Sequence, residues 1–219
     1  MNNTEVYSAE KADALDSGIR KVLQNPKRIL RGIIKEGMKV IDFGAGTGYF
    51  TLPIAEAVGP GGRVLAVDIQ REMLERIREK GEAAGFTERI ETAGCLGEGG
   101  DAPGSDLADA ALIFYVVHEV PEQDELARRL YDSVKPGGIC LLAEPKKHVS
   151  EEEFEVSVKL FEAAGFRVTG RMRICCSRSI LLRKVRFGKS ANTVSGFPSR
   201  PQELLSCPGP SPNFRARIY

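Results

Sequence analysis

Apolar residues occur along most of the chain either in short continuous runs or at helical spacing. The short runs predict buried strands at residues 40–43, 63–67, 108–117 and 139–143, and residues 89–93 read as a further strand with a weaker apolar pattern. Apolar side chains three or four residues apart predict helices at residues 49–58, 72–84, 121–134 and 151–164. Strands that alternate with helices in this way are typical of a mostly parallel sheet with helices on both faces.

The last regular segment has a different pattern. Residues 166–173 and 179–185 read as two strands joined by a short turn, which predicts an antiparallel hairpin. We therefore expect an α/β fold of the Rossmann-like, doubly wound type. Its seven-stranded sheet would be mostly parallel, with the antiparallel hairpin at its C-terminal end.

The two ends of the chain differ from this central part. Apolar residues on one helix face, followed by a break at Asn25-Pro26 and a second short helix, predict helical structure in residues 1–38. From Phe187 onward, prolines recur among serine and glycine without a sustained period. We therefore expect a helical lid region at 1–38, a main α/β domain at 39–186 and a flexible, basic tail at 187–219.

The composition is that of an ordinary globular protein, with 42% apolar and 28% charged residues. No apolar run approaches the roughly 20 residues that a membrane span needs. Residues 1–11 lack the hydrophobic centre of a signal peptide. The five cysteines are odd in number and scattered, which does not indicate a disulfide framework. We expect a cytoplasmic protein that does not contact membranes.

The net charge of +1 hides an asymmetry along the sequence. Residues 166–219 hold 11 Lys or Arg and one acid, whereas residues 1–165 hold 20 basic and 29 acidic side chains. A basic C-terminal segment can bind nucleic acid or another anionic surface. The simpler explanation, which we favour, is a solvated tail that offsets an acidic body.

Residues 40–48 place a glycine-rich turn between the first strand and the helix after it. The run reads Val-Ile-Asp-Phe-Gly-Ala-Gly-Thr-Gly. A strand, a glycine turn and a helix present a cofactor site at the carboxyl end of the strand. A dinucleotide site needs Gly-x-Gly-x-x-Gly, so that a pyrophosphate can sit on the helix N-terminus. The third glycine would have to replace Tyr49 or Thr51, which argues against a nicotinamide dehydrogenase.

Asp68 lies at the end of the second predicted strand, 20 residues after Gly48. A carboxylate at this point can accept hydrogen bonds from both hydroxyls of a ribose, as it does in dinucleotide-binding proteins. The alternative is a turn residue before a helix, where Asp is common. The neighbouring glycine turn favours the ribose role.

The pattern Asp42-x-Gly44-x-Gly46-x-Gly48, after a strand and before a helix, resembles the first motif of the class I S-adenosylmethionine-dependent methyltransferases. The resemblance implies S-adenosylmethionine as the cofactor. It places the three glycines against the methionine part of the cofactor, and it gives Asp42 a role in holding the amino group.

The adenine end of such a site is less regular in this sequence. The resemblance places Ile69 near the adenine. Many members of the family carry Gly-Asp-Ala after the third strand, with the acid near the adenine amine, but here the matching stretch is Gly94-Cys95-Leu96. We therefore assign Cys95 to the cofactor site. Either backbone groups there contact the adenine, or Glu98 or Asp101 reaches it.

The resemblance covers about residues 37–185. Asp109 and the Ala-Ala-Leu-Ile-Phe that follows look like the entry to the fourth strand of the family. This would place Phe114 beside the methionine end of the cofactor and the acceptor. Residues 114–120 and 144–146 look most similar to small-molecule enzymes related to quinone-biosynthesis C-methyltransferases and arsenite methyltransferases. The Asp-Pro-Pro-Tyr type of motif of base-amine methyltransferases is absent.

His118 and His148 are the only two histidines, and each lies just past the carboxyl end of a predicted strand. This is the ligand edge of an open α/β sheet. A histidine can take a proton from an acceptor near neutral pH, so both are candidate catalytic residues. The alternative is a helix cap or a structural hydrogen bond. Glu119 and Glu144 are weaker candidates.

The sequence does not indicate a metal site. Two histidines without a third ligand at a suitable spacing do not form a zinc site, and the chain has no Cys-x-x-Cys. Cys175 and Cys176 could bind a thiophilic metalloid together with Cys95 or Cys140. Adjacent cysteines at the start of a strand are more often packing residues.

These observations favour methyl transfer to a small-molecule acceptor. The transfer is an in-line displacement in which positioning of the acceptor supplies much of the rate. The alternative is a non-catalytic module that binds an adenosyl ligand, with the basic tail contacting nucleic acid or a partner protein.

Overall fold

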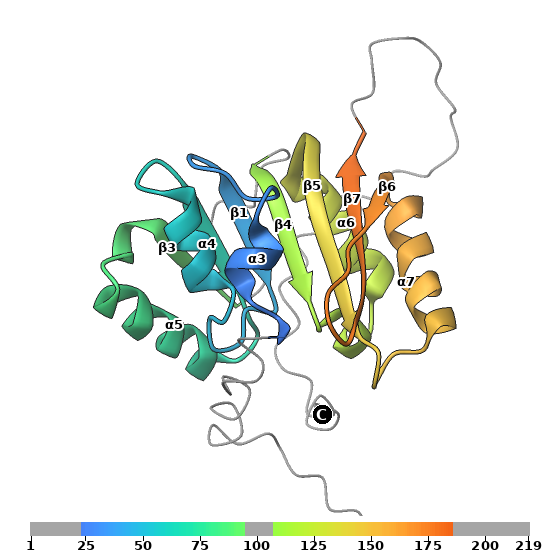
Figure 1. Cartoon of the computed structure of the whole chain (residues 1–219), viewed down its shortest axis with the longest axis horizontal. Coiled ribbons are helices and arrows are strands. Elements are labelled where there is room, and N and C mark those ends of the chain that lie inside the picture. Colours follow the sequence, from blue (N-terminus) through green and yellow to red (C-terminus); the bar gives the residue numbers. More distant parts are fainter. Residues whose placement is uncertain (1–22, 95–106, 186–219) are drawn as a thin grey trace, which may run out of the picture.

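The structure is a computed structural model that describes residues 23–94 and 107–185. The described part is one seven-stranded sheet flanked by helices (Figure 1). The strands are β1 (Lys39–Phe43), β2 (Arg63–Val67), β3 (Ile90–Ala93), β4 (Ala108–Phe114), β5 (Val134–Pro145), β6 (Phe166–Arg171) and β7 (Ser177–Lys184).

The order of the strands across the sheet is β3-β2-β1-β4-β5-β7-β6. The first five strands pair in parallel, and β7 pairs antiparallel with both β5 and β6. The predicted fold class, a mostly parallel sheet with a C-terminal antiparallel hairpin, is confirmed. The order reverses between β1 and β4, and ligands of open α/β sheets bind beyond the carboxyl ends of the strands at such a switch point.

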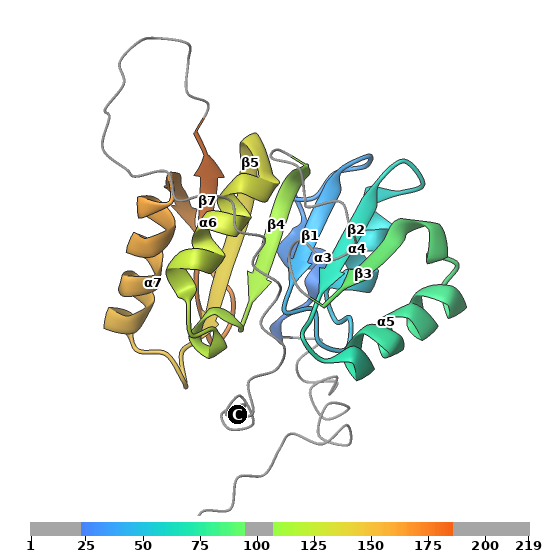
Figure 2. The ribbon, with the colours of Figure 1, turned by 180° about the vertical axis from the view of Figure 1, so that it is seen from behind.

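Helices cover both faces of the sheet. They are α3 (Pro26–Leu30), α4 (Thr51–Val58), α5 (Arg71–Ala83), α6 (Gln123–Ser133) and α7 (Glu151–Ala163), with short 3-10 helices η1 (Thr87–Arg89) and η2 (Val117–Glu119). Figure 1 shows α3 and α4 in front of the sheet, and Figure 2 shows α6 and α7 on the opposite face. This is the doubly wound arrangement that the alternating pattern predicts.

The side chains of β4 alternate between two hydrophobic cores. Leu112 packs with Ile54 and Val58 of α4, whereas Ile113 packs with Leu130 of α6 and Phe161 of α7. The strand is buried on both faces, so its sequence is continuously apolar rather than alternating.

Local signals explain several helix ends. The side chain of Asn25 accepts a hydrogen bond from the backbone N–H of Arg28 at the start of α3. A capping box starts α7, because Ser150 and Glu153 bond reciprocally to each other's backbone N–H. Gly85 follows α5 with a φ of 73°, which is typical of a glycine at a helix C-terminal cap.

Two predicted boundaries were wrong. The fourth strand was predicted to continue to Val117, but it ends at Phe114, and Tyr115 has a φ of 67° that turns the chain into η2. The fifth strand was predicted to start at Ile139. It begins at Val134, which pairs with Ala108 before a register shift.

The predicted domain boundaries at 38/39 and 186/187 stay predictions. Most of the predicted lid region and the whole predicted tail, residues 187–219, lie outside the described residues.

Candidate active site

The glycine turn connects β1 to α4 at the carboxyl edge of the sheet. Gly44, Gly46 and Gly48 have φ values of 72°, 52° and 85°, which L side chains adopt at a cost. The turn is tied to β2, because the backbone N–H groups of Gly44 and Ala45 both donate to the carbonyl of Val67. Residues 44–48 therefore form the tight turn that the glycine pattern predicts.

The glycines of the turn have different surroundings. A Cβ at Gly44 would lie 2.6 Å from the side chain of Val116, so Gly44 allows close packing against the segment after β4. A Cβ at Gly46 would meet nothing within 4 Å. Gly46 therefore faces open space, where a ligand can lie against the backbone.

Asp68 lies at the end of β2 and faces this turn. Its Oδ2 accepts a hydrogen bond from the backbone N–H of Gly46 at 2.8 Å, and its Oδ1 accepts one from that of Gln70 at 2.9 Å. Burial raises the pKa of Asp68, although the two N–H groups oppose this effect. The next residue, Ile69, is 63% exposed, which is unusual for a large apolar side chain.

Asp42 is buried beneath the turn rather than exposed at its surface. Its Oδ2 accepts a hydrogen bond from the hydroxyl of Thr51 at 2.6 Å. Burial raises the pKa of Asp42 to about 7, with the Thr51 hydrogen bond lowering it and the charge of Asp68 raising it further. The predicted contact of Asp42 with a ligand amino group would have to involve the other carboxylate oxygen.

Phe114 ends β4 inside an aromatic cluster. Its ring lies 4.5 Å from that of Phe50 and 4.4 Å from that of Tyr115, measured between centroids. Phe114 is only 7% exposed, so little of its surface is available to a ligand. The predicted cofactor contact of Phe114 is therefore limited to the edge of its ring.

His118 and Glu144 form a partly buried acid–base pair at the same edge of the sheet. The Oε1 atom of Glu144 accepts hydrogen bonds from the backbone N–H groups of Val116 and Val117, at 3.2 and 2.9 Å. Its Oε2 atom is hydrogen-bonded to Nδ1 of His118. The side chain of Glu144 is 1% exposed, whereas that of His118 is 24% exposed. Glu144 therefore holds His118 with the Nε2 atom outward.

The charges around His118 set its protonation. Burial by itself would lower the pKa of His118, but the hydrogen bond and the charge of Glu144, together with Glu119, raise it above its usual value. The Oε1 atom of Glu119 lies 3.8 Å from Nε2 of His118. Burial raises the pKa of Glu119 to about 7, despite the opposing charge of His118.

His148 lies near His118, as their predicted positions on one edge require. The two rings are stacked at 6.5 Å between centroids, with an angle of 8° between their planes. His148 is exposed, and its backbone N–H donates to the carbonyl of Pro145. The structure thus brings the two candidate histidines together.

A second hydrogen-bond network at this edge was missed from the sequence. The hydroxyl of Tyr115 contacts both the side-chain amide of Gln24 and the hydroxyl of Ser177. The same amide donates to the carbonyl of Cys175, and the hydroxyl of Tyr49 donates to the backbone carbonyl of Gln24. The sequence could not predict this network, because its residues are far apart along the chain. The positive φ of Tyr115 also could not be predicted, because the residues around it form an apolar run that reads as a continuous strand.

The structure limits the predicted roles of the cysteines. Cys95 lies outside the described residues, as do Glu98 and Asp101. Cys140 is fully buried in β5, so it cannot join the exposed Cys175 and Cys176 in a metalloid site. Among residues 23–94 and 107–185, no group of three or more His, Cys, Asp or Glu side chains is arranged to hold a metal ion.

Comparison with known proteins shows the family to which the chain belongs. A family model described as a methyltransferase domain matches residues 34–183, which is more than half of the chain. The chain belongs to this methyltransferase family. A crystal structure of a SAM-dependent methyltransferase from Aquifex aeolicus is 26% identical, with a TM-score of 0.71, over 82% of this chain and all of that one. S-adenosylmethionine (SAM) is thus the cofactor of the family.

Curated methyltransferases are also similar in sequence. A ubiquinone/menaquinone biosynthesis C-methyltransferase, UbiE, from Pasteurella multocida is 31% identical over 63% of this chain and 50% of its own length. The UbiE of Cronobacter sakazakii is 30% identical over 64% of this chain and 53% of its own length. The chain thus spans about half the length of these methyltransferase relatives.

The described residues fit the cofactor of this methyltransferase family. Gly46 leaves open space beside its backbone, and Asp68 offers a carboxylate held in place by two N–H groups, with lone pairs left on both oxygens. Ile69 provides exposed apolar surface beside that carboxylate. Within the described residues, no helix is long and apolar enough to span a membrane.

Proposed function

We propose that the chain transfers a methyl group from S-adenosylmethionine to a small-molecule acceptor, and that His118 removes a proton from that acceptor. When bound, the cofactor supplies an electrophilic methyl group. The acceptors that suit this site carry a weakly acidic proton at or beside the reacting atom, as phenols and enolisable carbon acids do. The similarity to enzymes named as C-methyltransferases supports a carbon acceptor.

The observation that carries this proposal is the pair formed by His118 and Glu144. The Nδ1–H of His118 donates to the carboxylate of Glu144, which leaves the lone pair of Nε2 as the proton acceptor. When Nε2 takes a proton, the imidazolium is stabilised by the adjacent carboxylate. General base catalysis of this kind contributes about 10²- to 10⁴-fold in rate. His118 would therefore accelerate the reaction by proton transfer, in addition to the effect of positioning the acceptor that the sequence suggests.

The glycine turn and Asp68 would hold the cofactor beside this pair. The backbone at Gly44, Gly46 and Gly48 would lie against the methionine part, and Asp68 would accept hydrogen bonds from the ribose hydroxyls. Asp42 would bind the amino group through the oxygen not used by Thr51. We also propose that Ile69 packs on the adenine, while the contact predicted for Cys95 stays a prediction.

Calorimetric titration with S-adenosylmethionine and S-adenosylhomocysteine tests the cofactor site. We expect binding of both to the full chain, and a loss of at least tenfold in affinity for Asp68→Ala, because the ribose hydroxyls lose a charged acceptor. Asp132→Ala, which removes an exposed carboxylate from α6, is the matched control and should bind as the unchanged chain does. Equal affinity of the Asp68→Ala variant would remove the basis for the ribose contact.

Methyl transfer itself is tested with a panel of phenolic, quinol and 1,3-dicarbonyl acceptors. Transfer of a labelled methyl group to at least one class is the expected result. Cofactor binding without transfer to any acceptor would instead favour a non-catalytic adenosyl-binding module.

A further inference from the structure

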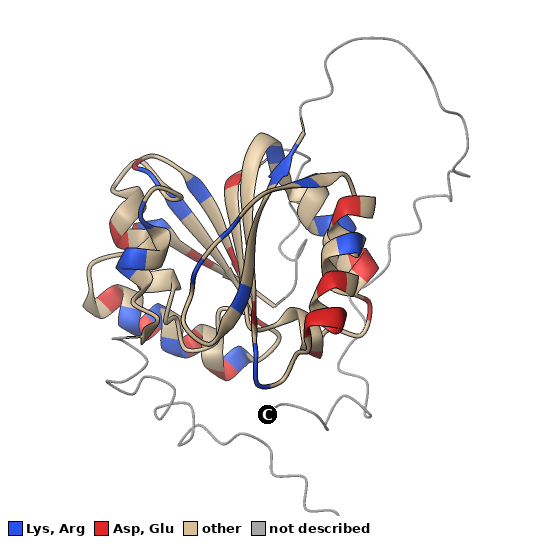
Figure 3. Cartoon of the chain, turned by 45° about the vertical axis from the view of Figure 1, so that its right-hand side comes forward, with Lys and Arg blue, Asp and Glu red and all other residues tan. Residues whose placement is uncertain are grey.

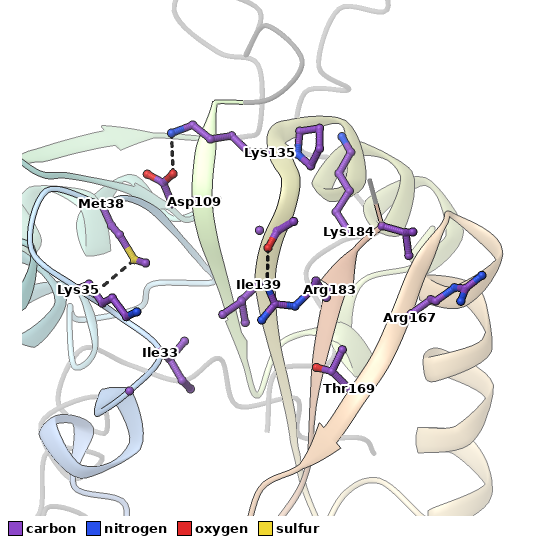
Figure 4. A pocket seen from close by; sticks show the side chains of 15 residues that line it. Ile33, Lys35, Met38, Asp109, Lys135, Ile139, Arg167, Thr169, Arg183 and Lys184 are labelled. Carbon is purple, nitrogen blue, oxygen red and sulfur yellow. Dashed lines mark hydrogen bonds and ion pairs between the residues drawn. The ribbon is translucent and has the colours of Figure 1, made fainter. Parts of the chain in front are cut away.

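A hollow of about 750 Å³ lies at the opposite edge of the sheet from the candidate active site (Figure 4). Its lining comes from the segment before β1, the start of β5, and the ends of β6 and β7 that reach this edge. The volume falls within the range of small-molecule sites, roughly 300 to 1,000 Å³. Ile33, Met38 and Ile139 give part of its wall an apolar character.

The charges that line this hollow are strongly unbalanced. Five cationic side chains line it, and they are Lys35, Lys135, Arg167, Arg183 and Lys184. Among the described residues, Asp109 is the single acid in the lining, and both of its carboxylate oxygens already have partners. One of its oxygens pairs with Lys135 at 2.6 Å, and the other accepts the backbone N–H of Lys39. The carboxylate therefore cannot neutralise the remaining cations.

Two arginines occupy directly opposed positions in the sheet. Arg167 of β6 and Arg183 of β7 are cross-strand partners, and both side chains are exposed. Like charges at directly opposed positions destabilise an antiparallel pair. Arg183 donates one hydrogen bond to the carbonyl of Gly137, and no acidic group in the described chain pairs with either guanidinium. Most of their N–H donors are therefore left for an anion.

Figure 4 shows how these side chains lie. Arg167 and Arg183 extend from neighbouring strands, with the Arg183 guanidinium directed toward β5 and the Arg167 guanidinium directed away from it. Lys135 is held toward Asp109 on the other side of β5. The buried Lys184 donates to the carbonyl of Tyr131, and its positive charge adds to the positive electrostatic potential in the hollow. Figure 3 marks the Lys and Arg positions of the ribbon in blue, and several of them lie at this edge.

We propose that this hollow is a binding site for an organic diphosphate. The two guanidiniums would bind the phosphoryl oxygens in the bidentate manner that arginine favours, and Lys35 would contact the outer phosphate. The apolar wall would hold the organic part of the ligand. The site lies on the edge away from the glycine turn and is thus separate from the proposed methyl-transfer chemistry.

Thermal unfolding of the full chain in the presence of inorganic pyrophosphate and of geranyl diphosphate tests the proposal. Each ligand should raise the melting temperature, by about 5 °C or more when its concentration is about 100 times the dissociation constant. Geranyl diphosphate should bind more tightly, because it adds contact with the apolar wall. Calorimetry should show a loss of at least tenfold in affinity for Arg167→Gln, which has no structural hydrogen bond to lose.

The same variant gives a second readout. Without ligand, Arg167→Gln should melt at the same or a higher temperature than the unchanged chain, because a repulsive pair has been removed. Arg173→Gln removes one exposed charge from the other end of the same hairpin and should leave diphosphate binding unchanged.

Three results would overturn the proposal. Equal diphosphate affinity of Arg167→Gln and the unchanged chain would show that the arginine pair is not the site. Equal affinity for the two diphosphates would refute the role of the apolar wall. Binding of a short RNA but of neither diphosphate would favour nucleic acid instead. S-adenosylhomocysteine affinity, measured alongside, should not change in Arg167→Gln, so failure here is distinguishable from failure of the proposed function.

Discussion

The two oxygens of the Glu144 carboxylate have different partners, and this gives His118 a fixed orientation. One oxygen is held by two backbone N–H groups, which leaves the other aimed at the imidazole. A carboxylate that is itself held in this way orients its neighbour without rotating toward solvent. The hydrogen bonds of a single buried carboxylate therefore set the orientation in which His118 would act as a base.

The pH dependence of methyl transfer should report this pair. Because the pKa of His118 is raised, the rate should fall as pH drops through a value above 6.5, where Nε2 becomes protonated. In Glu144→Gln this limb should move to lower pH, and the rate should drop by about 10²-fold or more. Initial rates between pH 5 and 9 provide the measurement.

Glu119 provides the control, because its pKa of about 7 falls in the same range. The acid limb should persist in Glu119→Gln if it belongs to His118. An unchanged limb in Glu144→Gln would show that another group controls the rate.

Asp42 should make the free energy of unfolding depend on pH. Burial raises its pKa from 3.8 to about 7, so the folded chain keeps a proton that the unfolded chain loses between these values. Stability from this residue therefore falls as pH rises through that window. The free energy of unfolding of Asp42→Asn, taken relative to that of the unchanged chain, should therefore increase by on the order of 4 kcal/mol from pH 4 to pH 8. Urea unfolding at the two pH values measures the difference.

A carboxylate with the opposite shift serves as the comparison. Burial would raise the pKa of Asp109, but Lys135 and the backbone N–H of Lys39 lower it below its usual value. Its contribution is present above its unfolded pKa and is lost as pH falls. The difference between Asp109→Asn and the unchanged chain should thus change in the opposite direction. The same pH trend for both variants would contradict this account.

The residue types of the candidate site could be predicted from the sequence, but their pairing could not. Asp42 and Asp68 follow apolar runs and precede helices, so their positions at the carboxyl edge are local information. The contact between His118 and Glu144 joins two strand ends that are 26 residues apart. It depends on how β4 and β5 pair, and no local pattern specifies that register.

At the scale of elements, the glycine turn and the segment that leads into η2 pack directly on each other. A Cβ at Gly44 would come within 2.7 Å of Cβ of Val116. Backbone adjustment in the turn therefore displaces the segment that carries His118. The cofactor turn and the proposed base are one packed unit.

Substitution in the turn tests this coupling. Gly44→Ala should cost about 3 kcal/mol of unfolding free energy, from the positive φ and from overpacking. Gly46→Ala is the matched control, since it has a positive φ but open space, and it should cost about 1 to 2 kcal/mol. Adding Val116→Ala should recover part of the loss in Gly44→Ala only. Denaturant unfolding of these four variants and of Val116→Ala alone gives the coupling, and additive effects would disprove it.

Most elements could be predicted because their signals are local. The second strand was confirmed at the predicted residues. The capping box before α7 and the glycine after α5 are signals of the same local kind. The segment Lys135 to Gly138 reads as a turn, yet it lies within β5, because pairing of Val134 with Ala108 extends the strand across it. Tertiary pairing here outweighs local preference.

At the scale of the whole molecule, the two edges of the sheet differ in chemistry. The carboxyl edge gathers carboxylates and histidines around open glycine backbone, and the other edge gathers cations around an apolar wall. The sequence indicated the first edge through its glycine pattern. It did not indicate the second, because Lys35, Lys135 and Arg167 come from separate elements and line one hollow only when β6 and β7 are in place.

The central position of β5 provides a probe of global unfolding. Cys140 is fully buried between β4 and β7, and burial raises the pKa of its thiol. Its alkylation should therefore require opening of the sheet and follow the free energy of global unfolding. Cys175 and Cys176 are exposed and should react at once. Peptide mass spectrometry after timed alkylation distinguishes them, and rapid reaction of Cys140 in native buffer would refute this placement.

The insertion of β7 between β5 and β6 has a consequence for biosynthesis. The strand β6 is made first, yet its only neighbour in the sheet is β7, the last described strand to be made. Until Lys184 has left the ribosome, β5 keeps an unpaired edge and β6 has nothing to join. A chain paused at this point exposes strand edges that favour association with other chains. Translation speed through the last hairpin should therefore influence the yield of folded protein.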